Sequence, residues 1–152
     1  MRPPLFATTA DSDWGDWRWH QQNRLTTLAD FERALRLTDD ERHALVATEG
    51  RFRAAVTPYW LGLIDPEDPT CPIRRQSIPT SGELLIWPGE RPDPLDEEGH
   101  MPVAGLTHRY PDRALLYTTH NCAMYCRFCT RKRKVSDPES ALAKSELDAG
   151  LD

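Results

Sequence analysis

Three cysteines in one short segment are the residues of this chain best suited to chemistry. Cys122, Cys126 and Cys129 follow a C-x3-C-x2-C spacing. An iron–sulfur cube normally takes four cysteine thiolates, so three ligands leave one iron open to bind and cleave another molecule. The spacing therefore predicts a [4Fe-4S] cluster with these three cysteines as its ligands, and it indicates an enzyme.

Other interpretations of the cysteines remain open. Structural zinc takes four closed Cys or His ligands, and His108 or His120 could join the three thiols, although no second cysteine pair exists. Inert buried thiols are a further alternative. Disulfides are disfavoured because residues 1–20 carry charges and three Trp rather than the apolar stretch of a signal peptide. Cys71 is expected to be a bystander, because a fourth thiolate would close the open iron.

The residues around the cysteines resemble a known family. The segment Cys122–Cys129 is similar to the cluster loop of radical S-adenosylmethionine enzymes. Three flanking segments narrow the resemblance to the lysine 2,3-aminomutases: Trp14–Arg24, Asp68–Pro79 and Gly105–Arg113. The resemblance covers most of the chain, roughly residues 14–135.

This resemblance implies three cofactors: a [4Fe-4S] cluster, S-adenosylmethionine and pyridoxal 5′-phosphate. It also implies that Arg109, Tyr110 and Arg113 line the pyridoxal phosphate pocket. Two guanidinium groups around a tyrosine suit that task, because they can grip a phosphate while the ring stacks on a flat cofactor. The alternative for this segment is a structural turn at Pro111 and Asp112 that leads into a strand.

A basic run from Arg131 to Lys134 stands out in a chain whose net charge is −5. The resemblance implies that Arg131 binds the α-carboxylate of the substrate, a task that suits a planar guanidinium. Lys132, Arg133 and Lys134 are expected mostly at the surface. Arg127 and Arg131 also bring positive charge next to the thiols, which favours the thiolate form. A nucleic-acid patch is disfavoured, because the run is short and no complementary basic face is evident elsewhere.

For the whole protein the resemblance implies an isomerase that converts L-lysine to β-lysine, with glutamate or arginine as alternative substrates. It also implies an electron donor of the flavodoxin or ferredoxin type and a homo-oligomer. Two interpretations from other classes remain: a structural zinc module, and an interaction module whose Trp-rich helices dock on a partner subunit. No apolar run is long enough to span a membrane, and available thiols suit a reducing cytoplasm. A cytoplasmic protein without membrane or nucleic-acid partners is therefore expected.

The elements that must hold these residues fall into three predicted segments. Residues 1–64 are predicted to form a helical N-terminal region. Residues 65–104 are predicted to be an extended arm, rich in Pro and acidic residues. Residues 105–152 are predicted to contain one strand, the cluster loop and one helix. The individual predictions are a helix over about 13–26, helices opened by Thr27, Thr38 and Pro58, a strand over 112–119, and a helix from Ala141 to Leu147 that is opened by Ser136–Glu139.

A single strand followed by a helix predicts the opening unit of a barrel, because a lone strand cannot satisfy its own backbone groups. The predicted fold class is α/β, with the helical region and the arm leading into the first β/α unit of a partial TIM-type radical S-adenosylmethionine barrel. The family's Gly-rich cofactor stretch and its pyridoxal lysine are not found, and Lys144 follows the cluster loop too closely to be that lysine. The chain is thus expected to be the N-terminal part of a longer enzyme and to be inactive in isolation.

Overall fold

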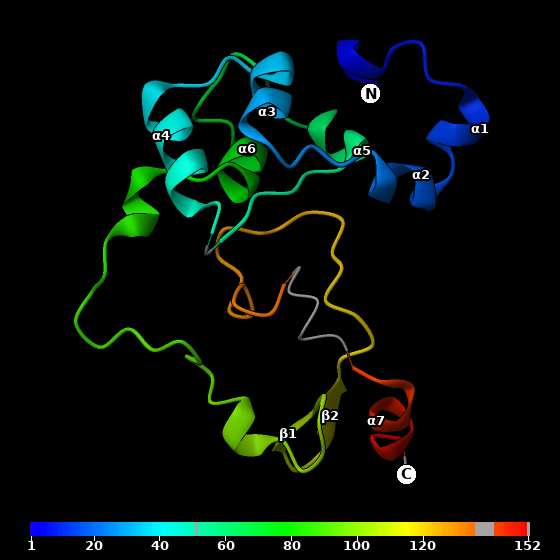
Figure 1. The fold of residues 1–152 in the computed structure, drawn as a ribbon, viewed down its shortest axis with the longest axis vertical. Helices are drawn as coiled ribbons and strands as arrows, with labels where there is room; N and C mark the ends of the chain where they lie inside the picture. Colours follow the sequence, from blue (N-terminus) through cyan, green and yellow to red (C-terminus); the bar gives the residue numbers. More distant parts are fainter. Residues whose placement is uncertain (51, 136–141, 152) are drawn as a thin grey trace. The chain divides into compact units, whose positions relative to one another are not determined.

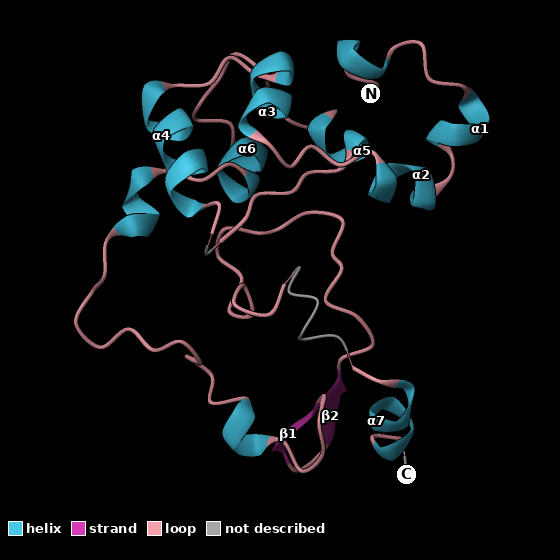
Figure 2. Cartoon of the chain, viewed as in Figure 1, coloured by secondary structure: helices cyan, strands magenta, loops and turns pink. Residues whose placement is uncertain are grey.

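The chain forms two compact units. Unit 1 contains residues 1–86 together with 123–129, and unit 2 contains residues 87–122 together with 130–152. Unit 1 is built from short helices, whereas the two strands belong to unit 2 (Figures 1 and 2). The chain thus enters unit 1 twice, and the second entry carries two of the three predicted cluster cysteines. The residues that the computed structural model describes are 1–50, 52–135 and 142–151.

Short α-helices and 3-10 helices make up the described part of unit 1. In chain order they are η1 Pro4–Phe6, α1 Asp11–Trp14, α2 Trp17–Gln22, α3 Leu28–Ala34, α4 Asp39–Thr48, α5 Pro58–Leu61, α6 Pro72–Ser77 and η2 Ser81–Leu84.

The starts of α3 and α4 follow the capping signals of the sequence. Thr27 Oγ1 accepts a hydrogen bond from the Asp30 backbone N–H, and the Asp30 carboxylate accepts one from the Thr27 N–H. Thr38 and Glu41 make the same reciprocal pair at the start of α4. Each pair satisfies two backbone N–H groups near a helix start. Both predicted helix starts are confirmed, and so is the start of α5 at Pro58.

The first predicted helix is wrong in extent, because two helices occupy that stretch. Helix α1 ends at Trp14, and the Asp16 side chain then caps the start of α2. Trp17, the first residue of α2, is 65% exposed. Trp14 instead lies against Trp19, with ring centroids 6.1 Å apart.

The predicted extended arm contains a helix, α6, which the sequence analysis missed. Pro72 suits its first turn, because proline has no N–H to leave unsatisfied and its φ is already helical. The fully buried Arg74 side chain donates to the Glu41 carboxylate on α4, from Nε at 2.8 Å and from Nη2 at 2.7 Å. It also donates to the backbone carbonyls of Arg36 and Pro66. These contacts tie α6 to α4.

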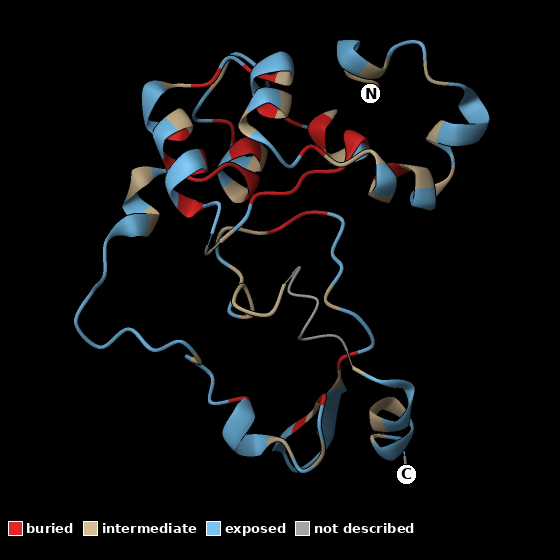
Figure 3. Ribbon diagram, viewed as in Figure 1, coloured by how far each residue is buried: buried red, intermediate tan, exposed pale blue. Residues whose placement is uncertain are grey.

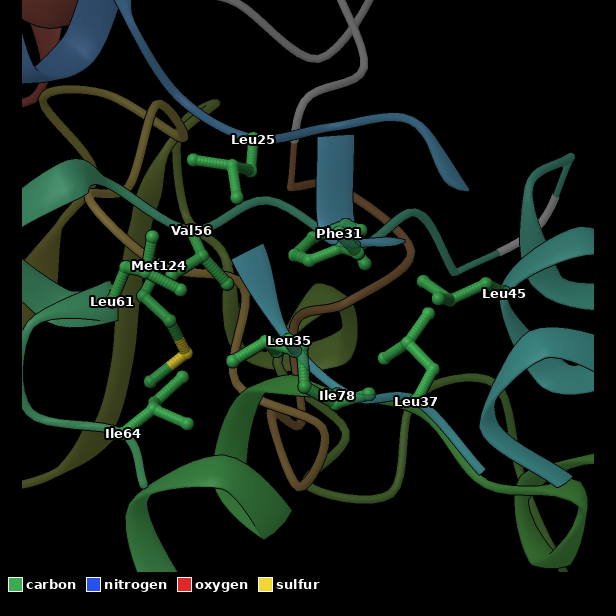
Figure 4. Close-up of a cluster of buried hydrophobic side chains, with 11 residues drawn as sticks. Leu25, Phe31, Leu35, Leu37, Leu45, Val56, Leu61, Ile64, Ile78 and Met124 are labelled. Carbon is green, nitrogen blue, oxygen red and sulfur yellow. The ribbon is translucent and has the colours of Figure 1, made fainter. Parts of the chain in front are cut away.

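A cluster of buried apolar side chains forms the core of unit 1 (Figure 4). Buried residues gather on α3 to α6 and on the segments between them, whereas β1 and β2 are mostly exposed (Figure 3). Met124 belongs to this core although it lies in the second entry of the chain. The core residues are Leu25, Phe31, Leu35, Leu37, Leu45, Ala54, Val56, Leu61, Ile64, Ile78 and Met124.

Unit 2 contains an antiparallel pair of strands, β1 Leu106–Tyr110 and β2 Arg113–Leu116. Pro111 and Asp112 form the turn between them, the structure that the sequence analysis gave as the alternative for this segment. The prediction of a single strand was wrong, because the residues of β1 were interpreted as part of a binding motif. The described strands and helices agree with a mixed α/β class, while an antiparallel hairpin does not by itself show a barrel.

The last described helix, α7, spans Lys144–Ala149. Its Glu146 carboxylate accepts a hydrogen bond from the Ala143 N–H at 2.7 Å, which helps to set its first turn. The predicted capping signal at Ser136–Glu139 and the predicted helix start at Ala141 lie outside the described residues. None of the described helices is long and apolar enough to cross a membrane.

Candidate functional site

Residues 123–129, called segment 123–129 below, pair with the backbone of unit 1. Met124 forms an isolated antiparallel bridge with Val56. The Tyr125 N–H donates to the Ala55 carbonyl at 3.0 Å. Both Met124 and Tyr125 are buried. The backbone directly before Cys126 is therefore held by hydrogen bonds and by burial.

The three predicted cluster ligands have different environments. Cys126 is half-buried and packs against the core of unit 1. Cys129 is also half-buried, and its N–H donates to the Cys126 carbonyl at 3.1 Å, which closes a tight turn. Cys122 is exposed and belongs to unit 2. All four cysteines of the chain are thiols rather than halves of disulfides, so the donor chemistry fits an iron–sulfur cluster.

Within residues 1–50, 52–135 and 142–151, no three His, Cys, Asp or Glu side chains are grouped so that they could hold a metal ion. This includes His108 and His120, the histidines considered for zinc. The cluster ligands therefore remain a prediction from spacing, thiol chemistry and resemblance.

Cys71 lies in unit 1, buried at the start of α6. Burial opposes ionisation of this thiol, but hydrogen bonds from backbone N–H groups, first that of Asp65, lower its pKa. Its expected role as a bystander stays a prediction.

Arg127 binds segment 123–129 to the rest of unit 1, the part formed by residues 1–86. Its Nε donates to Glu83 Oε1 at 2.9 Å and its Nη2 donates to Oε2 at 2.6 Å. The same guanidinium donates to the carbonyls of Arg53 at 3.0 Å and Phe52 at 2.9 Å. Sequence analysis assigned Arg127 only a charge effect on the thiols. It missed the anchoring role because Glu83 lies 44 residues earlier in the chain.

Arg109, Tyr110 and Arg113 come together at the tip of the β1–β2 hairpin. The Arg113 Cζ lies 4.7 Å, and the Arg109 Cζ 5.9 Å, from the centroid of the Tyr110 ring. Arg109 also donates to the Leu95 carbonyl at 2.9 Å. All three site residues are exposed. Two cations beside an exposed ring fit a flat ligand that carries a phosphate, and the assignment to pyridoxal phosphate remains a prediction.

Arg131 lies over the Tyr117 ring, with its Cζ 5.4 Å from the ring centroid. Its Nε donates to the Tyr117 hydroxyl at 3.4 Å, and its Nη2 donates to the Glu97 carboxylate. Partial burial acts to lower the pKa of Arg131. The two hydrogen bonds outweigh this effect and raise the pKa above its ordinary value. The guanidinium is therefore a permanent cation, as binding of a carboxylate would require.

The rest of the basic run is paired with acidic residues of the Pro-rich segment of unit 2. Arg133 lies 3.2 Å from both Asp93 and Glu98, and Lys134 lies 3.3 Å from Glu98, which begins the 3-10 helix η3 Glu98–His100. Arg133 and Lys134 are half-buried in these ion pairs, and their shared partner Glu98 is 60% exposed. The acidic partners offset the charge of the run, which further disfavours a nucleic-acid patch.

Comparison with known proteins gives a consistent family relationship. No protein-family model matches the chain. L-lysine 2,3-aminomutase of Clostridium subterminale is 43% identical over 151 residues, which cover 99% of this chain and 36% of the relative. L-lysine 2,3-aminomutase of Bacillus subtilis is 39% identical over 147 residues, or 97% of this chain and 31% of the relative. Glutamate 2,3-aminomutase of Clostridioides difficile is 38% identical over 142 residues, which cover 93% of this chain and 33% of the relative.

Fold and site together define a mixed α/β chain that carries a thiol-rich loop and a cationic hairpin. The chain is related in sequence to the L-lysine 2,3-aminomutases over nearly its whole length, which confirms the resemblance seen in the motifs. The chain spans about a third of the length of the curated relatives it matches.

Proposed function

We propose that the protein carrying this chain is an enzyme, a radical S-adenosylmethionine, pyridoxal phosphate-dependent aminomutase that converts L-lysine to β-lysine. The observation that carries the proposal is the 43% identity to an L-lysine 2,3-aminomutase over 151 residues. The reaction exchanges the amino group on Cα with a hydrogen on Cβ. Substrate and product therefore have the same formula, and turnover consumes no net oxidant or reductant.

In this proposal Cys122, Cys126 and Cys129 ligate three irons of a [4Fe-4S] cluster and leave the fourth iron open. When bound, the cluster and S-adenosylmethionine supply the radical chemistry, while the protein binds, orients and excludes side reactions. Pairing of segment 123–129 with unit 1 holds the backbone of the ligand loop. The Arg127 guanidinium supports the same loop through its hydrogen bonds to the Glu83 carboxylate.

The remaining predicted site residues would bind the organic groups. Arg109, Tyr110 and Arg113 would hold pyridoxal phosphate, with the guanidinium groups on the phosphate and the ring against the cofactor face. Arg131 would hold the α-carboxylate of the amino acid, since its guanidinium offers parallel N–H donors to both carboxylate oxygens.

Glutamate is the second candidate substrate, because one relative named glutamate 2,3-aminomutase is 38% identical to this chain. Arginine is a third candidate, from the motif resemblance alone. The proposal extends to a partial TIM-type barrel in the fold of the whole protein, a cytoplasmic location, a homo-oligomer and an electron donor of the flavodoxin or ferredoxin type.

The test uses the complete natural gene product that contains this chain, reconstituted without oxygen with iron, sulfide and both organic cofactors. We expect a brown protein with about four irons per chain that interconverts L-lysine and β-lysine. Cys126→Ser should lose both the iron and the activity, whereas the matched variant Cys71→Ala should keep both.

A colourless protein with stoichiometric zinc would contradict the proposal. Turnover of L-glutamate or L-arginine in place of L-lysine would correct the substrate and leave the class standing. The 152-residue chain by itself is expected to show no turnover with any of the three amino acids, and turnover by that chain would contradict this expectation.

A further inference from the structure

We propose that Glu97 is a positioning residue for Arg131: it holds one edge of the guanidinium and leaves the other edge to bind the carboxylate of the substrate. This inference rests on the proposed function, because it takes an amino acid as the ligand of Arg131. It concerns a residue that the sequence analysis did not single out.

The two edges of the Arg131 guanidinium are used differently. A guanidinium offers five N–H donors, and Nε with one N–H of Nη2 forms its side edge. The Tyr117 hydroxyl and the Glu97 carboxylate occupy this side edge. Across the described residues no partner is recorded for Nη1. The end edge, formed by Nη1 and the second N–H of Nη2, is therefore the fork that a carboxylate can use in a bidentate manner.

Burial explains why a ligand would add to Glu97 rather than replace it. The Glu97 side chain is only 5% exposed, whereas the Arg131 side chain keeps 32% of its surface exposed. Displacing Glu97 would leave a buried carboxylate without its cation, which is strongly unfavourable. A ligand that approaches the exposed end edge avoids this loss.

Tyr117 and its neighbours restrain the arrangement from a second side. The Tyr117 hydroxyl lies 2.9 Å from Thr107 Oγ1 on β1, in a buried contact. The Tyr117 backbone N–H donates to the Gly105 carbonyl at 2.8 Å. Because both the backbone and the hydroxyl of Tyr117 are held, two restrained groups, Tyr117 and Glu97, orient the Arg131 guanidinium.

Glu98 is a matched control for Glu97. It is the next residue in the chain and also a carboxylate, but its side chain is 60% exposed and pairs with Arg133 and Lys134. No contact between Glu98 and Arg131 is recorded in the part of the chain that the structure describes. The same substitution at the two positions therefore removes the same charge and differs in the contact with Arg131.

The experiment measures binding of L-lysine and of L-lysinamide by calorimetry to the complete natural gene product, loaded with its cluster and pyridoxal phosphate but without S-adenosylmethionine. L-lysinamide carries a neutral amide in place of the carboxylate and serves as the probe that cannot make the charge-assisted, bidentate contact with the fork. For Glu97→Ala we expect L-lysine affinity to fall about tenfold, the scale of one charge-assisted hydrogen bond, with L-lysinamide affinity unchanged. Glu97→Gln should retain part of the affinity, because its amide oxygen still accepts from Nη2. Glu98→Ala should bind both ligands like the unchanged protein.

Three results would overturn the inference, provided that Arg131→Lys still weakens L-lysine binding in the same assay. Tighter L-lysine binding in Glu97→Ala would mean that Glu97 competes with the ligand. Equal losses for the two ligands would mean that Glu97 only supports the fold. Equal behaviour of Glu97→Ala and Glu98→Ala would mean that contact with Arg131 has no effect. If the unchanged protein does not prefer L-lysine to L-lysinamide and Arg131→Lys has no effect, the assignment of Arg131 to the substrate carboxylate fails as well.

Discussion

Arginine side chains serve different purposes in this chain, and burial separates them. Arg74 is fully buried and donates to a carboxylate and two carbonyls, so its charge is committed to the structure of unit 1. Arg109 and Arg113 are exposed beside a tyrosine ring, where a ligand can reach them. Arg131 is intermediate, with one edge engaged and one edge accessible. Exposure of the guanidinium thus distinguishes a structural arginine from a candidate binding arginine.

Replacing Arg74 tests its structural role. Arg74→Met should lower the free energy of unfolding by about 3–5 kcal/mol at neutral pH, because Glu41 would remain buried without its cation. Burial of the Glu41 carboxyl acts to raise its pKa. Hydrogen bonds from Arg74 and Thr38 outweigh this effect and lower the pKa of Glu41 below its ordinary value of 4.5. In the unchanged chain this pair therefore stabilises the fold above that pH, and its contribution disappears as the pH falls.

In Arg74→Met the loss should shrink in acid, where Glu41 becomes protonated and no longer needs a cation. Urea unfolding at neutral and at acidic pH measures both effects. Arg42→Met is the control, since this side chain keeps 43% of its surface exposed and pairs with Glu32 and Asp39, and the substitution should cost about 1 kcal/mol or less. Equal losses in the two variants would contradict the assigned role of Arg74.

At the scale of elements, a short backbone pairing and one arginine hold segment 123–129. The bridge between Met124 and Val56 fixes the strand-like part, and the pairing of Arg127 with Glu83 fixes the part between Cys126 and Cys129. Loops that carry ligands need such support, because small displacements of metal ligands weaken the site. The proposed cluster loop is therefore positioned by unit 1.

Removing the Arg127 side chain should loosen this segment. Hydrogen bonds to charged groups contribute about 1.5–3 kcal/mol each, so in Arg127→Ala the backbone amides of Tyr125 and Arg127 should exchange at least about tenfold faster. In the complete protein the same variant should retain less iron. Hydrogen exchange and iron analysis measure the two effects. Arg53→Ala is the control, because the Arg53 backbone carbonyl that accepts from Arg127 is kept in this variant and the side chain that is removed is exposed. Unchanged amide exchange in Arg127→Ala would rule out the anchoring role.

At the scale of the whole molecule, unit 1 is discontinuous in sequence. Its core is completed by Met124, which lies 37 residues beyond Trp87, the first residue of unit 2. Unit 2 has an exposed two-stranded ribbon, and such ribbons are marginally stable by themselves. Stability of the described part therefore resides mainly in unit 1, to which segment 123–129 belongs.

The consequence is that Met124, a residue of segment 123–129, should affect the stability of unit 1. Met124→Ala should lower the free energy of unfolding by about 2–5 kcal/mol, the usual cost of truncating a buried methionine. Met101→Ala in unit 2 is the matched control, because Met101 is only half-buried, and its loss should be clearly smaller. Denaturant unfolding followed by circular dichroism measures both, and equal losses would contradict a core role for Met124.

Local patterns in the sequence predicted the features that neighbouring residues can set by themselves. Thr27 and Thr38 start helices because each cap acts within three residues, and Pro111 with Asp112 forms a turn because its geometry is local. The grouping of Arg109, Tyr110 and Arg113 follows from their positions on either side of that turn. The cysteine spacing and its flanking motifs were enough to identify the related family.

Only the tertiary structure decided which distant residues meet. Glu83 with Arg127, Glu41 with Arg74 and Glu97 with Arg131 are separated by 44, 33 and 34 residues. No periodicity links such partners, because their contact depends on how helices and loops pack rather than on local propensity. The sequence determined the chemical groups and the local turns and caps, and packing determined which carboxylates hold Arg74, Arg127 and Arg131 and which thiols are half-buried.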